Sequence, residues 1–575
     1  MPHPRAQDVR RLCQNLKPII GKRAEQLFQA YQAEDDEGKK QIQAYLEILA
    51  SQLLPTSLDR PDADLIPPSA ADAAGDYPVG QVVYAGKSQY DFAIREDECI
   101  QHVACFGRTG AGKTNLGFIL FDQFHRQGKP LLVFDWKRNY RDLLALPEYK
   151  DVEVYTIGGG IAPLTFNPLV PPAGTKPKTW LKKIIQVIAH AYMLGNGTLY
   201  MLQQTLDAMY QEFGVYDHDP AQGPIQYPTF RDLLNKLKRH QASGREAGWL
   251  SSTLRALASL CFGDMDTLVN QGSNQVLDHL LKKPVILELD ALTQSDKVFF
   301  IQALLLWIHH RRMAEGEREQ FKHAVFIEEA HHVLSNERYS LVGGQSVMDL
   351  TFREIREFGE CLVLFDQHPS QISLPALGNT YTTICLNLKH GKDVSTMAQA
   401  MLLDGEQKDL LGSLRVGEAI VKVQGRVPRP FMIHIPEFAI RKGRVDEAAV
   451  ACHMRPILQQ RGPFLDQTTN PLAPPPRRGS VKAGEQTSLQ EIEAALLQDV
   501  QAYPASGVAA RYKRLGISVR QGQKLKARLL QRSLVAEQQE HTKTGRLNRL
   551  VLTEAGSELL ARISPPEIPD PAVIA

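Results

Sequence analysis

The chain has 575 residues, 43% of them hydrophobic, and its 66 Lys or Arg nearly balance its 64 Asp or Glu. Because one hydrophobic core rarely organises so long a chain, we expect two or more domains. No apolar run reaches the roughly 18 residues that cross a membrane, and no apolar leader is evident, so we expect a cytoplasmic protein without membrane segments. The seven cysteines lack metal-ligand spacing, which argues against a cysteine metal centre.

The first hundred residues divide into three segments. Residues 1–58 carry apolar positions at helical spacing on both sides of the acidic turn Glu34–Glu37, which predicts two amphipathic helices. They form either a small helical cap or a docking site for another subunit or protein. Residues 59–79 are rich in Pro, Asp and Ala and predict a linker. Residues 80–100 alternate apolar and polar positions, which predicts a short β-region.

Residues 101–440 alternate β-rich runs with helical stretches, a pattern that predicts an α/β core with a parallel sheet. Consecutive amphipathic helices over residues 178–282 predict an all-helical insertion. Residues 441–485, which include Pro474–Pro476, predict an extended linker, and residues 563–575 a tail. The predicted core strands are 102–106, 131–135, 152–156, 285–289, 324–327, 361–365, 383–386 and 418–423.

A phosphate-binding loop is predicted where a strand is followed by Gly-Arg-Thr-Gly-Ala-Gly-Lys-Thr and then a helix. The glycines let backbone amides turn towards a triphosphate at the positive end of the helix. Lys113 would reach the β- and γ-phosphates, and the Thr114 hydroxyl would coordinate Mg²⁺. A glycine turn that matches by chance is disfavoured by the correct flanking elements. We therefore predict that ATP with Mg²⁺ is bound by Gly107, Arg108, Thr109, Gly110, Ala111, Gly112, Lys113, Thr114 and Asn115.

Two strand ends compete to supply the acidic residues that such a loop requires. The first offers Glu328 for the metal shell and Glu329 for the attacking water. The second offers Asp366 as metal ligand, and it follows Leu341–Gln345, which resembles the signature of ABC transporter ATPases. The next residue there is Gln367, which cannot act as a base at neutral pH, so we favour the first site. Gln367 is then predicted to sense the γ-phosphate, or else it caps a strand end.

Taken together, these motifs resemble the HerA and FtsK group of hexameric DNA-pumping ATPases, most closely HerA, over residues 80–440. The resemblance implies a RecA-like P-loop ATPase core assembled as a homo-hexamer, with ATP between subunits and duplex DNA in the centre. It also implies a partner nuclease or other effector. The residues that carry it are Gly107–Thr114, Leu132–Lys137, Phe166–Leu169, Val325–His331, Arg353–Gly359, Phe365–Ser370 and Gly417–Val421.

The resemblance further implies that an arginine of the neighbouring subunit completes each site. We favour Arg356 for this role, with Arg353 second; both could instead pair with nearby glutamates on the surface. Asp135 matches an acidic position of the family and is assigned to the nucleotide site. The chain departs from the family in Glu328–Glu329, which replaces an Asp-Glu pair, and in Asp366–His368, which replaces a Thr-Gln-Arg sensor.

Residues 486–562 predict a C-terminal winged helix, because they are typical of three helices, a hairpin and a fourth helix. They hold 12 Lys or Arg against 7 Asp or Glu, although the net charge of the whole chain is only +2. This surplus predicts contacts with DNA phosphates; a winged helix that binds protein is the alternative. The predicted contact residues are Arg520, Lys524, Lys526, Arg528, Lys543 and Arg546.

The sequence therefore predicts an ATPase that translocates or remodels duplex DNA as a ring, in DNA repair or antiviral defence. The alternative is an ATP-regulated oligomeric scaffold that gates an anti-phage defence effector without moving along DNA. A conjugation or secretion ATPase is disfavoured, because such proteins normally carry a membrane anchor.

Overall fold

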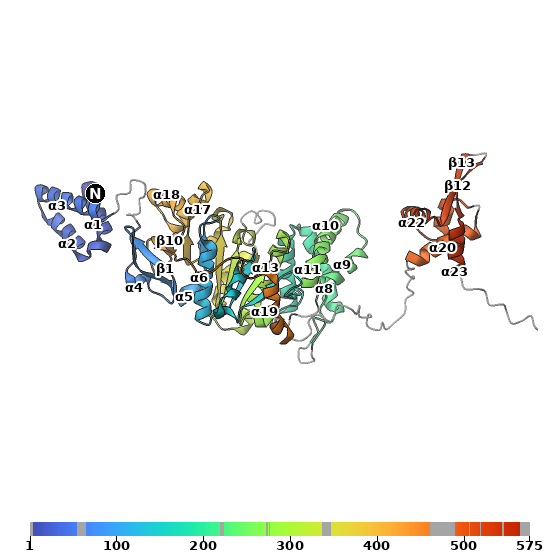
Figure 1. The fold of residues 1–575 in the computed structure, drawn as a ribbon, viewed down its shortest axis with the longest axis horizontal. Helices are drawn as coiled ribbons and strands as arrows, with labels where there is room; N and C mark the ends of the chain where they lie inside the picture. Colours follow the sequence, from blue (N-terminus) through green and yellow to red (C-terminus); the bar gives the residue numbers. More distant parts are fainter. Residues whose placement is uncertain are drawn as a thin grey trace, which may run out of the picture. The chain divides into compact units, whose positions relative to one another are not determined.

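The computed structural model describes residues 4–54, 65–218, 224–271, 274, 277–335, 347–460, 489–504, 506–517, 519–542 and 545–563. The chain forms two compact units, Met1–Leu465 and Asp466–Ala575 (Figure 1), and each is described by itself. None of the helices within these described ranges is both long enough and apolar enough to cross a membrane.

The first unit is built on one mixed sheet, whose order over the described residues is β2-β1-β11-β10-β9-β3-β8-β7-β4-β6-β5. From β9 to β5 all neighbouring strands are parallel, whereas β2, β1, β11 and β10 join antiparallel. All eight predicted core strands are present, and β11 is an additional one. The strands are β1 Tyr77–Tyr84, β2 Lys87–Ile94, β3 Val103–Phe106, β4 Leu131–Asp135, β5 Glu153–Thr156, β6 Pro284–Glu288, β7 His323–Glu328, β8 Glu360–Asp366, β9 Thr382–Cys385, β10 Glu418–Val423 and β11 Phe431–His434.

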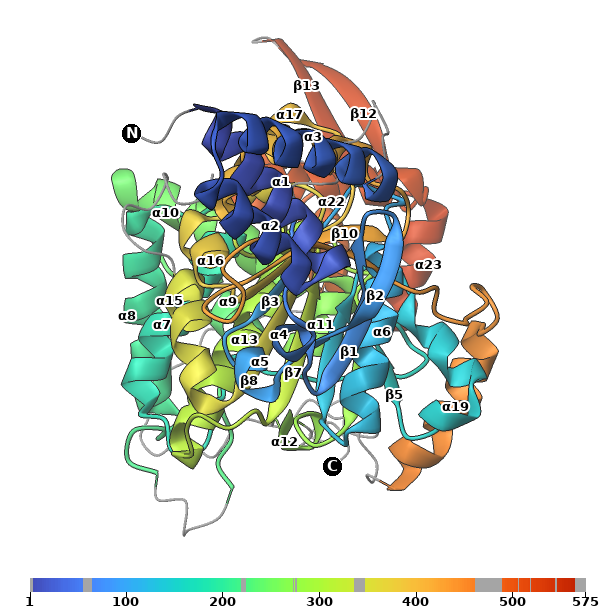
Figure 2. The same ribbon diagram turned by 90° about the vertical axis from the view of Figure 1, so that its left-hand side faces the viewer.

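Helices cover both faces of the parallel strands, which explains why these strands are continuously apolar in sequence. On one face, α6 (Lys113–Arg126) packs Phe124 against Phe326 of β7. On the other, the buried helix α13 (Gln294–Glu315) packs Phe300 against Phe134 of β4. Figure 2 shows α6 on one side of the sheet and α7, α8 and α15 on the other. The α/β fold class predicted from the sequence is confirmed.

The helical insertion lies between β5 and β6. Its helix α7 packs against both α13 and α8, so the insertion extends the layer on the α13 face. Trp180 of α7 is fully buried, and its indole nitrogen donates to the carbonyl oxygen of Pro168 at 2.9 Å. The described helices of this region are α7 Pro177–Ala191, α8 Asn196–Glu212, α9 Phe230–Lys238, α10 Arg245–Leu260, α11 Gly263–Val269 and α12 Leu277–Leu280.

The β-region predicted at residues 80–100 is the hairpin β1–β2. It was predicted as a region separate from the core, and this was wrong. Strand β1 pairs with β11, with Val82 opposite Ile433, so the hairpin continues the core sheet. Alternating residues indicate that one face of a strand is buried, but not which strand will pair with its edge. The partner here was the one core strand that the sequence had not revealed.

Over its described residues, 4–54, the N-terminal segment contains three helices and not the predicted two: α1 (Pro4–Ile20), α2 (Lys22–Ala33) and α3 (Asp36–Leu53). The additional break falls at Gly21, whose φ of 61° is readily adopted by glycine. The acidic turn was placed correctly, because the Asp35 carboxylate caps α3. These helices have their own small core, and the Tyr84 hydroxyl of β1 donates to a carbonyl oxygen of α1.

The prediction of an extended linker over residues 441–485 was wrong for its first part, because these residues include a helix of the first unit. Helix α19 (Glu447–Gln460) packs on the core and buries Val450 and Met454 completely. The ring of His453 hydrogen-bonds the Val152 carbonyl oxygen at 2.7 Å, which fixes the helix beside β5. The residues up to 460 therefore belong to the first unit, and residues 461–485 lie outside the described ranges.

In the second unit, the described elements follow the predicted order of three helices, a hairpin and a helix. Buried Arg511 donates to the Asp499 carboxylate at 2.9 Å and ties α21 to α20. The assignment of this unit as a winged helix remains a prediction. Its elements are α20 Leu489–Ala502, α21 Val508–Arg514, α22 Val519–Gln531, β12 Val535–Thr542, β13 Gly545–Leu552 and α23 Glu554–Ile563.

Candidate nucleotide-binding site

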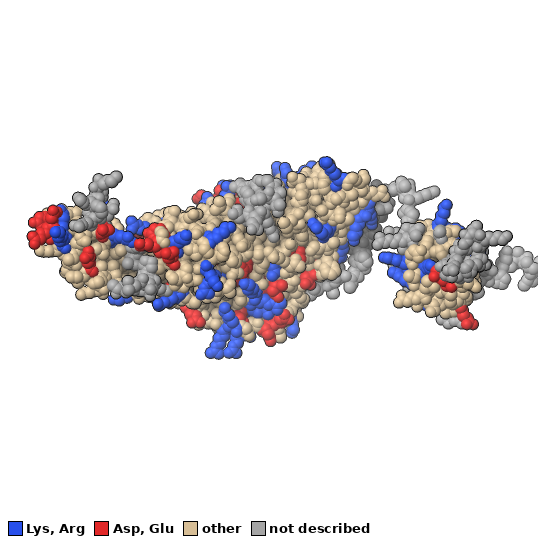
Figure 3. All heavy atoms as spheres, turned by 90° about the horizontal axis from the view of Figure 1, so that it is seen from above, with Lys and Arg blue, Asp and Glu red and all other residues tan. Residues whose placement is uncertain are grey.

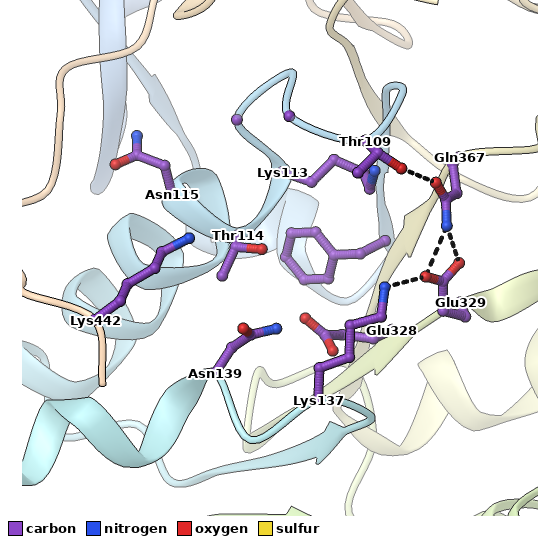
Figure 4. Close-up of a pocket in the computed structure, with 13 residues that line it drawn as sticks. Thr109, Lys113, Thr114, Asn115, Lys137, Asn139, Glu328, Glu329, Gln367 and Lys442 are labelled. Carbon is purple, nitrogen blue, oxygen red and sulfur yellow. Dashed lines mark hydrogen bonds and ion pairs between the residues drawn. The ribbon is translucent and has the colours of Figure 1, made fainter. Parts of the chain in front are cut away.

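A cavity of about 340 Å³ lies where β3, β7 and β8 end. Carboxyl ends of neighbouring parallel strands meet at one edge of a sheet, which is why residues distant in sequence converge here. Figure 4 shows the phosphate-binding loop on one side of the cavity and the carboxylates of Glu328 and Glu329 opposite. The lining residues are Thr109, Gly110, Gly112, Lys113, Thr114, Asn115, Lys137, Asn139, Glu328, Glu329, Phe365, Gln367 and Lys442.

The phosphate-binding loop requires glycine at two positions. Gly110 has a φ of 79° and Gly112 a φ of 112°, which side-chain-bearing residues rarely adopt. Within this curve the Lys113 ammonium donates to the carbonyl oxygen of Gly107 at 2.6 Å and to that of Arg108 at 3.2 Å. Burial lowers the pKa of Lys113. The Lys113 side chain therefore lies inside the loop, where a bound anion could replace the loop carbonyl oxygens as its hydrogen-bond acceptor.

A chain of hydrogen bonds joins the loop to Glu329. The Thr109 hydroxyl donates to the Gln367 Oε1 at 2.6 Å, and the Gln367 Nε2 donates to both Glu329 oxygens at 2.8 and 2.9 Å. From the other side, the Lys137 ammonium lies 3.0 Å from the Glu329 Oε1. Glu329 is thus positioned by three elements of the fold: the phosphate-binding loop, the end of β8 and the turn after β4.

Glu329 has two features typical of a functional carboxylate. Its φ is 48°, in the left-handed region that non-glycine residues seldom occupy and in which they are enriched at functional sites. Burial would raise its pKa, but the hydrogen bonds from Gln367 and Lys137 outweigh burial, so the pKa is lowered. The carboxylate is therefore held ionised, as an acceptor of protons must be.

Glu328 is in a different electrostatic state from its neighbour. Burial and the adjacent negative charge of Asp135 raise the pKa of Glu328 to about 8. Among the described residues, its carboxyl group accepts a hydrogen bond only from the Trp136 amide, at 3.3 Å. A divalent cation would supply the positive charge that this carboxylate lacks, and the Thr114 hydroxyl lines the same cavity. The oxygens of Thr114 and Glu328 therefore suit Mg²⁺.

Two predicted acidic residues are engaged in structural hydrogen bonds and do not line the cavity. Asp135 accepts from the amides of Lys137 and Tyr140 at 3.0 and 2.8 Å, so it shapes the turn that presents Lys137. Asp366 accepts from the amides of His331 and His368, both at 2.6 Å, and from the His331 ring. These bonds leave Asp366 poorly placed as a metal ligand. The Leu341–Gln345 segment of the competing interpretation lies outside the described residues.

Five other predicted site residues also do not line the cavity, namely Gly107, Arg108, Ala111, Arg353 and Arg356. The Arg108 side chain turns away to Asn387, donating to its Oδ1 at 2.8 Å, and Ala111 is buried within the loop. Arg353 and Arg356 belong to α15 (Val347–Glu354) and the short helix η6 (Ile355–Phe358), before β8. Since the cavity lies after β8, these arginines are not brought to the site of their own chain.

Four lining residues were not assigned to the site from the sequence, namely Lys137, Asn139, Phe365 of β8 and Lys442. Lys137 and Asn139 follow the end of β4, and their position after a parallel strand beside β7 is the signal that would have found them. Lys442 follows β11 in a segment predicted to be linker. Only the tertiary structure brings it to the cavity.

The geometry agrees with comparisons to known proteins. Residues 77–305 match the family model described as the central domain of the helicase HerA. The chain contains a HerA-like P-loop ATPase domain. The match includes the phosphate-binding loop and ends within α13, so Glu328, Glu329 and Gln367 of the HerA-like core lie beyond it.

Two relatives and one solved structure resemble this chain over a longer stretch of residues. The double-strand break repair helicase HerA of Sulfolobus acidocaldarius is 21% identical over 64% of this chain and 71% of its own. A probable helicase of Methanocaldococcus jannaschii is 23% identical over 60% of this chain and 64% of its own. The structure of VirB4 of Thermoanaerobacter pseudethanolicus aligns with a TM-score of 0.50 and 16% identity, covering 64% of this chain and 97% of that chain. This last likeness concerns the fold alone.

Proposed function

We propose that the chain binds ATP with Mg²⁺ and hydrolyses it, with Glu329 as the base that activates water. The observation that carries this proposal is the convergence on Glu329 of Gln367, Lys137 and the phosphate-binding loop. Lys113 would leave its loop carbonyls for the β- and γ-phosphates, and the Gln367 Nε2, which donates to Glu329 in this structure, would donate to the γ-phosphate instead. Thr114 and Glu328 would hold the metal, which neutralises phosphate charge when bound.

No arginine lines the cavity within the described part of the chain, which supports a ring in which a neighbouring subunit supplies one. The described cations that line the cavity are lysines, namely Lys113, Lys137 and Lys442. An arginine that stabilises the transferring phosphoryl group is worth about 10³-fold or more in rate in enzymes that use one. We propose that Arg356 of a neighbouring subunit supplies this group, with Arg353 as the second candidate, in a homo-hexamer.

Mixing two inactive variants tests the contribution in trans. Arg356→Ala and Glu329→Gln should each lower ATP turnover about 100-fold or more. In mixed rings some sites pair an intact Glu329 with an intact Arg356 from the neighbour, so turnover should return. The same experiment with Arg353→Ala is the matched control. If native mass spectrometry shows mixed rings that stay inactive, the proposal for Arg356 is wrong.

The substrate we propose is duplex DNA, which the ring translocates or remodels. The basic surplus of the second unit supports this, because Lys524 and Arg528 of α22 are exposed, whereas Lys526 pairs with Glu537. The side chains of Arg520 and Arg546, and all of Lys543, lie outside the described residues. By contrast, acidic side chains gather at one end of the N-terminal helices (Figure 3), where the exposed turn Glu34–Glu37 would repel DNA. That segment suits contact with a partner nuclease or other effector.

Displacement of a triplex-forming strand from duplex DNA distinguishes a motor that moves along DNA from a scaffold that does not. A motor should release the third strand with ATP and without any partner, and Glu329→Gln should abolish release. A protein that hydrolyses ATP but leaves the triplex intact would be a scaffold that gates an effector.

A further inference from the structure

A backbone segment after the last core strand is fastened beside the cavity at both ends. We call residues 436–445 the strap. At its first end, the Asn115 side chain donates to the carbonyl oxygen of Pro436 and accepts from the amide of Phe438, both at 2.8 Å. The Phe438 ring also stacks on Phe118 of α6, with 5.7 Å between ring centroids. The first turn of the helix that follows the phosphate-binding loop therefore holds the strap.

The second end is held by one carboxylate. Asp142 is 4% exposed and accepts hydrogen bonds from three consecutive amides, those of Gly443, Arg444 and Val445, at 2.7, 2.8 and 3.0 Å. Hydrogen bonds to an ionised acceptor are about twice as strong as those between neutral groups. The strap is consequently fixed on both sides of its cavity-lining residue, Lys442.

Lys442 lies between these two anchors and lines the cavity together with Asn115 and Asn139. Figure 4 shows its ammonium directed towards Thr114, on the side away from Gln367 and Glu329. Under the proposed chemistry, Glu329 and Gln367 mark the γ-phosphate end of the nucleotide. The loop amides cradle the α- and β-phosphates, so Lys442 faces the opposite end, towards the α-phosphate and ribose.

We propose that the strap forms a subsite for the α-phosphate of the nucleotide, with Lys442 as the cation that contacts it. This inference rests on the proposed binding of ATP and adds a residue that distinguishes the two ends of the ligand. A contact at the α-phosphate is present with both ATP and ADP. Lys442 therefore retains the product as well as the substrate, whereas Lys137, beside Glu329, favours the triphosphate.

Titration calorimetry on the full chain with unlabelled ATPγS and ADP, each with Mg²⁺, tests the subsite. Lys442→Ala should raise the Kd of both nucleotides about tenfold, as expected for one charge-assisted contact, and by equal factors within about twofold. Arg441→Ala is the matched control, because this exposed neighbour has the same charge but does not line the cavity. It should leave both Kd values unchanged, and Lys442→Arg should restore most of the affinity.

Asp142→Asn tests the strap without touching the cavity. Weaker amide bonds should free Lys442 and raise both Kd values, while a thermal melt verifies that the variant is folded. Equal affinity of Lys442→Ala and the unchanged protein would overturn the proposal, as would a loss confined to ATPγS, since that places Lys442 at the γ-phosphate. Absence of nucleotide binding by the unchanged protein would instead refute the proposed function.

Discussion

Strand β7 has an ionisable residue at each end, and the two ends are built differently. At its amino end, buried His323 hydrogen-bonds the Glu360 Oε2 at 2.7 Å, and Arg312 donates to the Glu360 Oε1 at 2.5 Å. At its carboxyl end, Glu328 is buried with a pKa raised to about 8. Glu360 has the Arg312 guanidinium and the His323 ring beside it, whereas the raised pKa of Glu328 means that its surroundings favour the uncharged form. A buried carboxyl group with so perturbed a pKa indicates where a cationic ligand would stabilise the ionised form.

The largest expected effect is at the carboxyl end. Glu329→Gln keeps the shape of the side chain but removes the proton acceptor, so ATP turnover should fall about 100-fold or more. ATP binding should persist, because the phosphate-binding loop is unchanged. Phosphate release measures the first quantity and calorimetry the second. Normal turnover in this variant would show that Glu329 is not the base.

A substitution at the amino end of β7 should lower the stability of the fold and leave catalysis unchanged. Glu360→Ala leaves Arg312 and His323 buried without their carboxylate, and breaking a buried pair in this way costs about 3–5 kcal/mol. We expect that loss in the free energy of unfolding measured by denaturant titration. Nucleotide affinity per folded molecule should be unchanged. A stable but inactive variant would mean that the two ends of β7 are functionally coupled.

Acid should destabilise the fold through His309 of α13. This ring is buried, neither of its nitrogens has a hydrogen-bond partner among the described residues, and burial lowers its pKa to about 3. The unfolded chain takes up a proton below about pH 6.5 and the folded chain does not, so stability falls as pH falls. The loss should reach about 2 kcal/mol at pH 5. His309→Phe should flatten this dependence; an unchanged pH profile would assign the acid sensitivity to other groups.

Lys137→Ala should have the smallest effect. The side chain is 60% exposed, and we expect it to position Glu329 by an ion pair that water partly screens. Turnover should fall less than about tenfold, and Lys137→Arg should restore it because the ion pair is retained. A loss as large as that of Glu329→Gln would give Lys137 a direct part in the transfer.

Local sequence patterns predicted those features of the core that depend on residues close together in the sequence. The loop from Gly107 to Thr114 lies between β3 and α6 because glycine, lysine and threonine at fixed spacing need only a strand and a helix around them. The acidic pair at the end of β7 was found for the same reason. The break at Gly21 was missed because one glycine inside a helical pattern does not by itself end a helix.

Long-range pairings were less predictable. The hairpin β1–β2 joined the core sheet because β11 offered an edge, and four residues of β11 carry too little pattern to be read alone. Asp135 and Asp366 have the residue type expected of a site, yet their hydrogen bonds go to backbone amides of neighbouring turns. Residue type at a strand end therefore indicates a position near the site, but the direction of each side chain depends on its neighbours.

By itself, the sequence determined that this protein has an α/β core with a phosphate-binding loop and an adjacent pair of carboxylates, because periodicity and motif spacing are local properties. The tertiary structure alone decided that Gln367 and Lys137 both reach Glu329, and that Lys442 enters the same cavity from a segment read as linker. The physical reason is that parallel strands bring their carboxyl ends to one edge, and Asn115 and Asp142 draw the strap to that edge through hydrogen bonds with its backbone.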